Sequence, residues 1–168
     1  MLNIGVIGGS TAEKKYLEIA EKIGRLLASR NVVVICGGKN GVMESVSRGV
    51  HDAGGIVVGI LPGLSTSEGN AYLTVAIPTG IGYARNFLIV RASDALIAID
   101  GSTGTLSEAS FALTEGKSVV SINTHIETKL KNGDGKLLAA QTAEEAVDLV
   151  MKEAQDHRDS QEPLSEDD

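Results

Sequence analysis

Three short apolar runs in this chain each end in a glycine-rich loop that is followed by a helix-like stretch. The three loops are Gly8-Gly9-Ser10, Gly37-Gly38-Lys39-Asn40-Gly41 and Gly101-Ser102-Thr103-Gly104-Thr105. The start of a helix presents unpaired backbone N–H groups and the positive end of the helix dipole, and glycine lets a ligand approach that backbone closely. Three such junctions predict a site for an anionic ligand, most simply a phosphorylated one.

Apolar runs alternate with helix-like stretches along most of the chain. The runs at 3–7, 32–36, 56–61, 73–77, 95–99 and 118–122 are expected strands, and 12–30, 42–53, 82–92, 105–114 and 143–154 are expected helices. This alternation predicts an α/β fold, a Rossmann-like doubly wound parallel sheet with helices on both faces. A ligand then sits outside the carboxyl ends of the strands, where the glycine loops leave. Residues 123–141 are expected to form a surface loop or hairpin.

The formal charge of −7 is concentrated at the end of the chain. Seven acidic side chains and Arg158 give residues 153–168 a net charge of −6, which leaves −1 for residues 1–152. We therefore expect one nucleotide- or phosphate-binding domain over 1–152 and a solvated, disordered acidic tail over 153–168. A nearly neutral domain argues against a nucleic-acid surface.

Targeting signals and disulfides are not expected. The single cysteine, Cys36, ends an apolar run and reads as a small buried core residue, which fits a reducing compartment. The first residues lack a basic, apolar leader, and no apolar run approaches the roughly 18 residues that a membrane span needs. The sequence thus predicts a cytoplasmic protein with no membrane partner.

Several ligand motifs are missing. Gly116-Lys117-Ser118 lacks the upstream glycine of a P-loop, and the first loop lacks the full Gly-x-Gly-x-x-Gly of dinucleotide binders. The three histidines lie in separate segments without metal-ligand spacing to Cys36. No metal site is therefore predicted.

Two polar residues stand out near the loops, and each has two readings. Glu108 follows the third loop, where Thr105-Leu106-Ser107-Glu108 has the spacing of a capping box, so its carboxylate either caps the helix or faces the ligand. The same spacing recurs at Ser10–Glu13 and Thr142–Glu145. Arg85 is either a surface ion-pair residue or a ligand contact.

Two motifs in order resemble those of the LOG-like family, historically labelled lysine decarboxylases. Residues 37–43 are similar to its Gly-Gly-x-x-Gly-x-Met motif, and residues 100–108 to its Pro-Gly-Gly-x-Gly-Thr-x-x-Glu motif. The segment 78–86 between them is closer to a sub-branch, the molybdenum cofactor carrier-like proteins. The resemblance covers about residues 4–122 and implies a homodimer or larger homo-oligomer.

Enzymes of this family are phosphoribohydrolases that cleave the N-glycosidic bond of a nucleoside 5′-monophosphate with an arginine and the last glutamate of the second motif. The resemblance implies these catalytic roles for Arg85 and Glu108. A carboxylate facing the ribose would stabilise the positive charge that develops there, and a guanidinium would orient the phosphate or leaving base. No lysine has a recognisable pyridoxal-phosphate context, so a decarboxylase is not predicted.

The loops supply the expected ligand- and phosphate-binding residues. These are Gly8, Gly9, Ser10, Gly37, Gly38, Gly41, Met43, Gly101, Ser102, Thr103, Gly104 and Thr105. The chain departs from the family pattern at Asp100, Ser102 and Asn86, which stand in place of proline, glycine and lysine. A carboxylate at Asp100 beside an anion site would repel phosphate unless it points away. These departures favour ligand binding over catalysis.

Three functions follow as hypotheses. The favoured one is a binding protein for a phosphorylated nucleotide-like or pterin ligand of the molybdopterin type, with no further cofactor required. The alternatives are a nucleoside 5′-monophosphate phosphoribohydrolase and an interaction protein that senses a ligand. The sequence does not identify the ligand.

Overall fold

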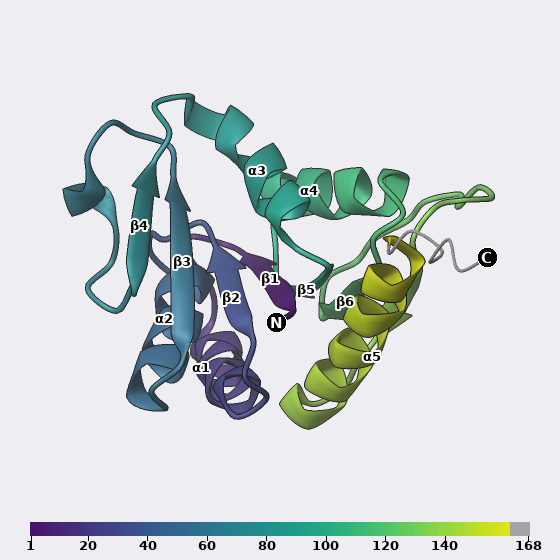
Figure 1. Cartoon of the computed structure of the whole chain (residues 1–168), viewed down its shortest axis with the longest axis horizontal. Coiled ribbons are helices and arrows are strands. Elements are labelled where there is room, and N and C mark those ends of the chain that lie inside the picture. Colours follow the sequence, from purple (N-terminus) through teal and green to yellow (C-terminus); the bar gives the residue numbers. More distant parts are fainter. Residues whose placement is uncertain (162–168) are drawn as a thin grey trace, which may run out of the picture.

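Every strand of the sheet runs parallel to its neighbours in the computed structural model, which describes residues 1–161 (Figure 1). The strands are β1 (Asn3–Gly8), β2 (Val33–Cys36), β3 (Ile56–Leu61), β4 (Val75–Pro78), β5 (Ala95–Ile99), β6 (Val119–Ile122) and β7 (Leu137–Ala139). The helices are α1 (Lys14–Ala28), α2 (Val42–Asp52), α3 (Arg85–Ala92), α4 (Thr103–Thr114) and α5 (Ala143–Gln161), with short 3₁₀ turns η1 (Thr66–Glu68) and η2 (Gly82–Ala84). The predicted α/β, doubly wound class is confirmed.

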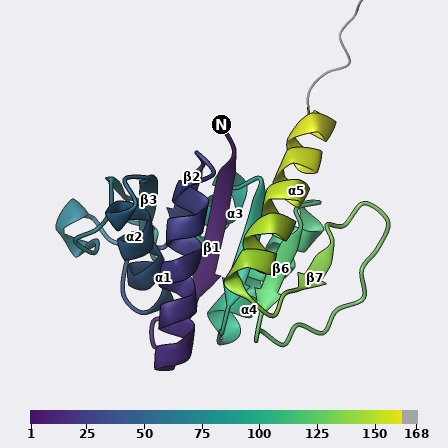
Figure 2. The ribbon, with the colours of Figure 1, turned by 90° about the horizontal axis from the view of Figure 1, so that it is seen from below.

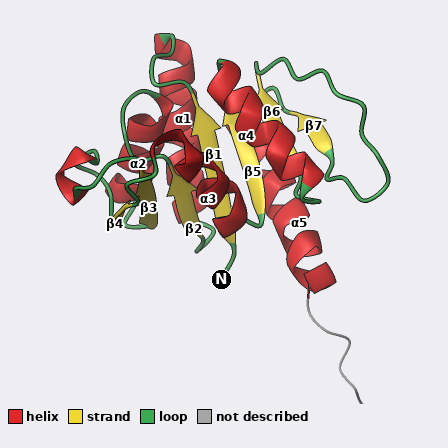
Figure 3. Ribbon diagram, turned by 90° about the horizontal axis from the view of Figure 1, so that it is seen from above, coloured by secondary structure: helices red, strands yellow, loops and turns green. Residues whose placement is uncertain are grey.

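The helices cover both faces of the sheet, as Figures 2 and 3 show from opposite sides. Apolar side chains of α1, α2 and α5 pack in one buried cluster, and those of α3 and α4 pack in another on the opposite face. Strands covered on both faces read as continuous apolar runs, and β5 and β6 are buried along their whole length. No helix within residues 1–161 is long and apolar enough to cross a bilayer.

The strand order is β4-β3-β2-β1-β5-β6-β7. The chain therefore winds outward from β1 through β2 and β3 to one edge, then returns to place β5 against the other side of β1. This reversal makes a switch point between β1 and β5, where ligands of such sheets bind. The three glycine-rich loops follow β1, β2 and β5 at that carboxyl edge.

Two expectations for the end of the chain are wrong. The 123–141 segment is not only loop, because residues 137–139 form β7, which pairs in parallel with β6. The stretch 153–161 is not a disordered tail but the last part of α5. Charge alone does not show that side chains of this stretch pack against the domain. Residues 162–168 of the predicted tail lie outside the described part of the chain.

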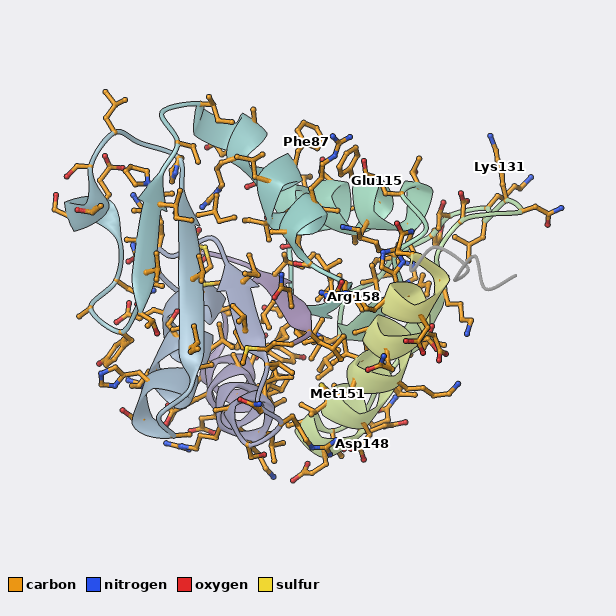
Figure 4. The ribbon with its side chains drawn as sticks, viewed as in Figure 1. Phe87, Glu115, Lys131, Asp148, Met151 and Arg158 are labelled. Carbon is orange, nitrogen blue, oxygen red and sulfur yellow. The ribbon has the colours of Figure 1, made fainter. Side chains whose placement is uncertain are left out.

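The far half of α5 is anchored by charged side chains. Glu153 is buried and accepts a hydrogen bond from Ser118 Oγ at 2.8 Å. Arg158, labelled in Figure 4 on α5, donates to both carboxylate oxygens of Asp94 at 3.0 and 2.6 Å. A long helix that contributes such partners belongs to the folded domain, so the boundary expected at residue 152 is too early.

Candidate functional site

The three glycine-rich loops meet at Gly9. Its N–H donates to the carbonyl of Asp100 in the third loop at 3.2 Å, and its carbonyl accepts from the Val42 N–H at the start of α2 at 3.1 Å. Gly41, which precedes α2, has a φ of 67° and lies so close to the first loop that a Cβ atom there would collide with the Gly9 carbonyl. Close packing of two backbones therefore accounts for glycine at this position.

A central hollow of about 160 Å³ lies where these loops meet. Its lining residues come from all three loops and from the α3 region; they are Val6, Ile7, Gly8, Gly9, Ser10, Gly37, Met43, Tyr83, Arg85, Asn86, Ser102, Gly104, Thr105 and Glu108. The fold thus brings Arg85 and Glu108 into one hollow with most of the predicted loop residues.

Arg85 is the first residue of α3 and is held by the main chain of two neighbouring strands. Its Nη1 donates to the carbonyls of Gly37, just after β2, and Ile60 in β3, while its Nε donates to Asn86 Oδ1 at 2.8 Å. Burial lowers the pKa of Arg85, and the nearby Glu108 carboxylate opposes that shift. These bonds fix the guanidinium plane and leave Nη2 without a hydrogen bond to any of residues 1–161.

Glu108 is not a helix cap. Because α4 begins at Thr103 rather than Thr105, the carboxylate lies in the second turn, and no side-chain cap bond forms at Ser102. The same spacing at Ser10–Glu13 gives no side-chain cap bond either, whereas Glu145 accepts from the Gln141 N–H before α5. The start of the helix is set by the packing of α4 on the sheet, which the spacing of neighbouring residues does not predict.

The Glu108 side chain is buried but lacks protein partners. The residue is only 9% exposed, and none of residues 1–161 donates a hydrogen bond to its carboxylate. Burial raises the pKa of Glu108 to about 7, against a smaller opposing effect of Arg85. At neutral pH this acid is therefore close to half protonated, beside a fixed cation, and can either donate to or accept from a ligand.

The start of α4 supplies main-chain donors at the rim. The first helical hydrogen bond there runs from the Leu106 N–H to the Ser102 carbonyl. The preceding N–H groups, of Thr103, Gly104 and Thr105, come before this ladder begins and are free to meet an anion. At the start of α2 the Val42 N–H already donates to the Gly9 carbonyl. The start of α4 therefore has more N–H groups available to a ligand.

Some predicted site residues do not line the central hollow. Gly38 has a φ of 72° and packs on Gly59 and Leu61, Gly101 packs on the Thr105 side chain, and Gly41 packs on the first loop. Asp100 is not among the lining residues either. This acidic departure from the family pattern therefore does not line the hollow.

Two further hollows adjoin the central one. The α4 hollow, of about 690 Å³, is lined by Ser10, Tyr83, Ala84, Asn86, Phe87, Ser102, Thr103, Gly104, Ser107 and Glu108. The Pro62 hollow, of about 340 Å³, is lined by Ser10, Lys39, Asn40, Met43, Pro62, Gly82, Tyr83 and Arg85. Sequence reasoning missed Tyr83 as a lining residue, although its place two residues before Arg85 was a usable signal.

A separate hollow of about 430 Å³ lies at the carboxyl ends of β6 and β7. It is lined by Tyr16, Ile19, Ser121, Ile122, Asn123, Thr124, His125, Ala139, Ala140 and Gln141. It contains none of the predicted site residues and no buried acid facing a fixed cation. The smaller central hollow is therefore the better candidate, because chemistry rather than volume distinguishes it.

Comparisons with known proteins agree with this geometry. The profile of the SLOG cluster4 family matches residues 1–147. An uncharacterized protein of Archaeoglobus fulgidus is 38% identical over 90% of this chain and 95% of its own length. The molybdenum cofactor carrier protein of Chlamydomonas reinhardtii superimposes with a TM-score of 0.81 at 29% identity, over 90% of this chain and 98% of that one.

The chain is also similar to cytokinin enzymes of plants. The cytokinin riboside 5′-monophosphate phosphoribohydrolase LOG3 of Arabidopsis thaliana is 36% identical over 62% of this chain and 51% of its own length. The chain therefore spans about half the length of that relative. The expected resemblance to the LOG-like family and its carrier branch is confirmed.

Proposed function

Because the chain belongs to the SLOG cluster4 family, we propose that it is a binding protein for a small phosphorylated ligand, nucleotide-like or pterin. The observation that carries this proposal is the central hollow, where Arg85 and the loop backbones face one space. The likeness to a molybdenum cofactor carrier protein supports a molybdopterin-type ligand.

The contacts of the site support binding more than turnover. Three donors of Arg85 are already committed to Gly37, Ile60 and Asn86, so the arginine acts as a fixed positive charge rather than a mobile one. The α4 N–H groups add neutral donors for a phosphate. Together they hold an anion without needing a metal or a further cofactor.

One observation favours the phosphoribohydrolase as the second candidate. Arg85 and Glu108 line the same hollow, as an N-glycosidase of this type needs. A carboxylate there would stabilise positive charge on the ribose, but its pKa near 7 leaves only part of it ionised at neutral pH. Turnover by this chain would therefore be slow and would rise with pH across that value.

We also propose that the chain forms a homodimer. Large apolar side chains stay exposed on the α3 and α4 layer, among them Phe87 (labelled in Figure 4), Leu88 and Leu106. Patches of this kind mark interaction surfaces. If a ligand controlled this association, the protein would act as a sensor, and the molecular mass with and without AMP by light scattering separates that function from simple binding.

Incubation with AMP separates binding from hydrolysis. We expect AMP to bind by calorimetry without measurable release of adenine by chromatography over hours. Glu108→Gln should keep the affinity, since the amide removes a carboxylate close to the phosphate. Rapid adenine release by the unchanged protein, lost in Glu108→Gln, would instead establish the hydrolase.

A further inference from the structure

Tyr83 is the most exposed large hydrophobic side chain among residues 1–161, at 92%. The other two tyrosines have partners: Tyr16 is buried, and Tyr72 meets the His51 ring edge-on at 5.7 Å. Within the described chain the Tyr83 ring contacts no other ring. Folding therefore gains little from this aromatic side chain, although a tyrosine ring carries a large surface that is favourable to cover.

Tyr83 lines all three of the connected hollows. Of all the lining residues, only Tyr83 and Ser10 are shared by the central, α4 and Pro62 hollows. Tyr83 lies in η2, directly after Gly82, whose φ is 61°. The ring thus stands at the crossing of three connected spaces.

Shared residues give these hollows an order. The α4 and central hollows share Glu108 and Asn86, and the central and Pro62 hollows share Met43 and Arg85. The central hollow therefore lies in the middle. At about 160 Å³ it is smaller than the roughly 300 Å³ at which ligand pockets begin, so a nucleotide-sized ligand must extend into its neighbours.

The two end hollows differ in chemistry. The α4 hollow includes Thr103 and Gly104 at the open start of α4, which suits a phosphate. The Pro62 hollow offers the flat or soft surfaces of Pro62, Met43 and Tyr83, which suit an aromatic ring because sulfur and π faces both pack well on such rings.

Lys39 completes the Pro62 hollow. It is half-buried, lines that hollow, and forms no ion pair within residues 1–161. An ammonium group donates hydrogen bonds and accepts none, so it matches a ring that carries an oxo group or ring nitrogen at its edge. A hydrocarbon ring would leave this cation unpaired.

We propose that Tyr83 is a stacking platform that holds a planar heteroaromatic ring in the Pro62 hollow. This inference rests on the proposed function, since the ring belongs to the ligand whose phosphate lies at α4. Tyr83 sets specificity: it separates ligands with a heteroaromatic ring from sugar phosphates without one.

The test compares nucleotides with the sugar phosphate that lacks the base. Calorimetry measures the affinities of GMP, AMP and ribose 5-phosphate for the full chain and for Tyr83→Ala, Tyr83→Phe and Ile81→Ala. Ile81 is the matched control, because it is 50% exposed in the same segment and lines none of the three hollows. We expect both nucleotides to bind the full chain more tightly than ribose 5-phosphate.

Tyr83→Ala should reduce nucleotide affinity at least about fivefold, the lower end of base–aromatic stacking, and leave ribose 5-phosphate affinity unchanged. Tyr83→Phe and Ile81→Ala should keep the nucleotide preference. A preference that survives Tyr83→Ala would overturn the platform while leaving the proposed function intact. If Tyr83→Ala changes only the molecular mass by light scattering, the ring is a contact between copies and the platform is equally refuted. Failure of all three ligands to bind the full chain would overturn the platform and the nucleotide form of the proposed function.

Discussion

Buried charged side chains lie at both the amino and the carboxyl ends of the strands, here called the amino edge and the carboxyl edge, but only those at the amino edge are hydrogen-bonded within the described part of the protein. At the amino edge, Lys117 donates to the Val90 and Arg91 carbonyls at 2.7 and 3.0 Å. Glu153 accepts there from Ser118, and also from Lys136 at 3.2 Å. At the carboxyl edge, Glu108 is also largely buried, but its carboxylate oxygens stay accessible and receive no hydrogen bond from residues 1–161.

This contrast separates structural charges from functional ones. A buried charge costs stability unless it is paired and hydrogen-bonded, and at the amino edge those partners come from the end of α3 and from the residues before β6 and β7. An acid left without them keeps its hydrogen-bonding capacity for something outside the chain. The comparison thus supports the proposed ligand site at the carboxyl edge independently of the glycine motifs.

The largest effect should come from Gly41→Val. Its positive φ and its collision with the Gly9 carbonyl predict a loss of about 3 kcal/mol or more in unfolding free energy. Gly104→Ala is the control, because a Cβ there meets nothing within 4 Å and alanine favours a helix. Urea unfolding of both variants measures the difference. A stable Gly41→Val protein would show that the loops are not packed as described.

Glu108→Gln should stabilise the protein at neutral and alkaline pH. The pKa of Glu108 rises from 4.5 in the unfolded chain to about 7 when folded, so the folded state binds the extra proton between these values. Its stability therefore falls as pH rises from 4.5 to 7, and glutamine removes that fall, roughly 2 to 3 kcal/mol above pH 7. Unfolding at pH 4.5 and pH 8 tests this. An equal gain at both pH values would contradict a buried, proton-linked acid.

Deleting residues 156–168 should lower the melting temperature by several degrees. The deletion removes Arg158 and its bonds to Asp94. A loss of about 1 to 2 kcal/mol in unfolding free energy lowers the melting temperature of a chain of this size by several degrees. Truncation after Gln161 keeps the pair and is the control. A melting temperature that the longer deletion leaves unchanged would mean that the far half of α5 contributes nothing.

Arg85→Lys should cost about 1 to 2 kcal/mol of stability, since one ammonium nitrogen cannot reproduce both the Nη1 bonds to Gly37 and Ile60 and the Nε bond to Asn86. Arg91→Lys is the matched change at an exposed ion pair with Glu115 and should stay within about 0.5 kcal/mol. Thermal unfolding compares them. Equal, small losses of stability in the two variants would show that the hydrogen bonds of Arg85 do not stabilise the site.

Local sequence signals predicted the inner strands and the helices between them, because buried parallel strands are continuous apolar runs. They failed at β7 and at 153–161, where long-range partners decide the outcome. Leu137–Ala139 becomes a strand because it can pair with the free side of β6. Glu153 is buried because Ser118 and Lys136 donate hydrogen bonds to its carboxylate.

The site was predictable only in part. The motifs indicated the loops and the pair Arg85 and Glu108, which share one hollow. Spacing alone left open whether Glu108 caps the helix or faces the ligand, since the start of α4 depends on packing against the sheet. The structural reasons for Gly38 and Gly41 lie in contacts with distant backbone, which no local pattern reports.

Mass spectrometry of small molecules released from freshly purified protein tests most directly whether the carboxyl edge holds a ligand. The unchanged protein and Arg85→Lys would be denatured side by side after identical purification. We predict that the unchanged protein releases a phosphorylated heterocyclic compound in near-stoichiometric amount and that Arg85→Lys releases much less. Equal amounts from both proteins, or no phosphorylated compound from the unchanged one, would contradict a ligand site built on Arg85.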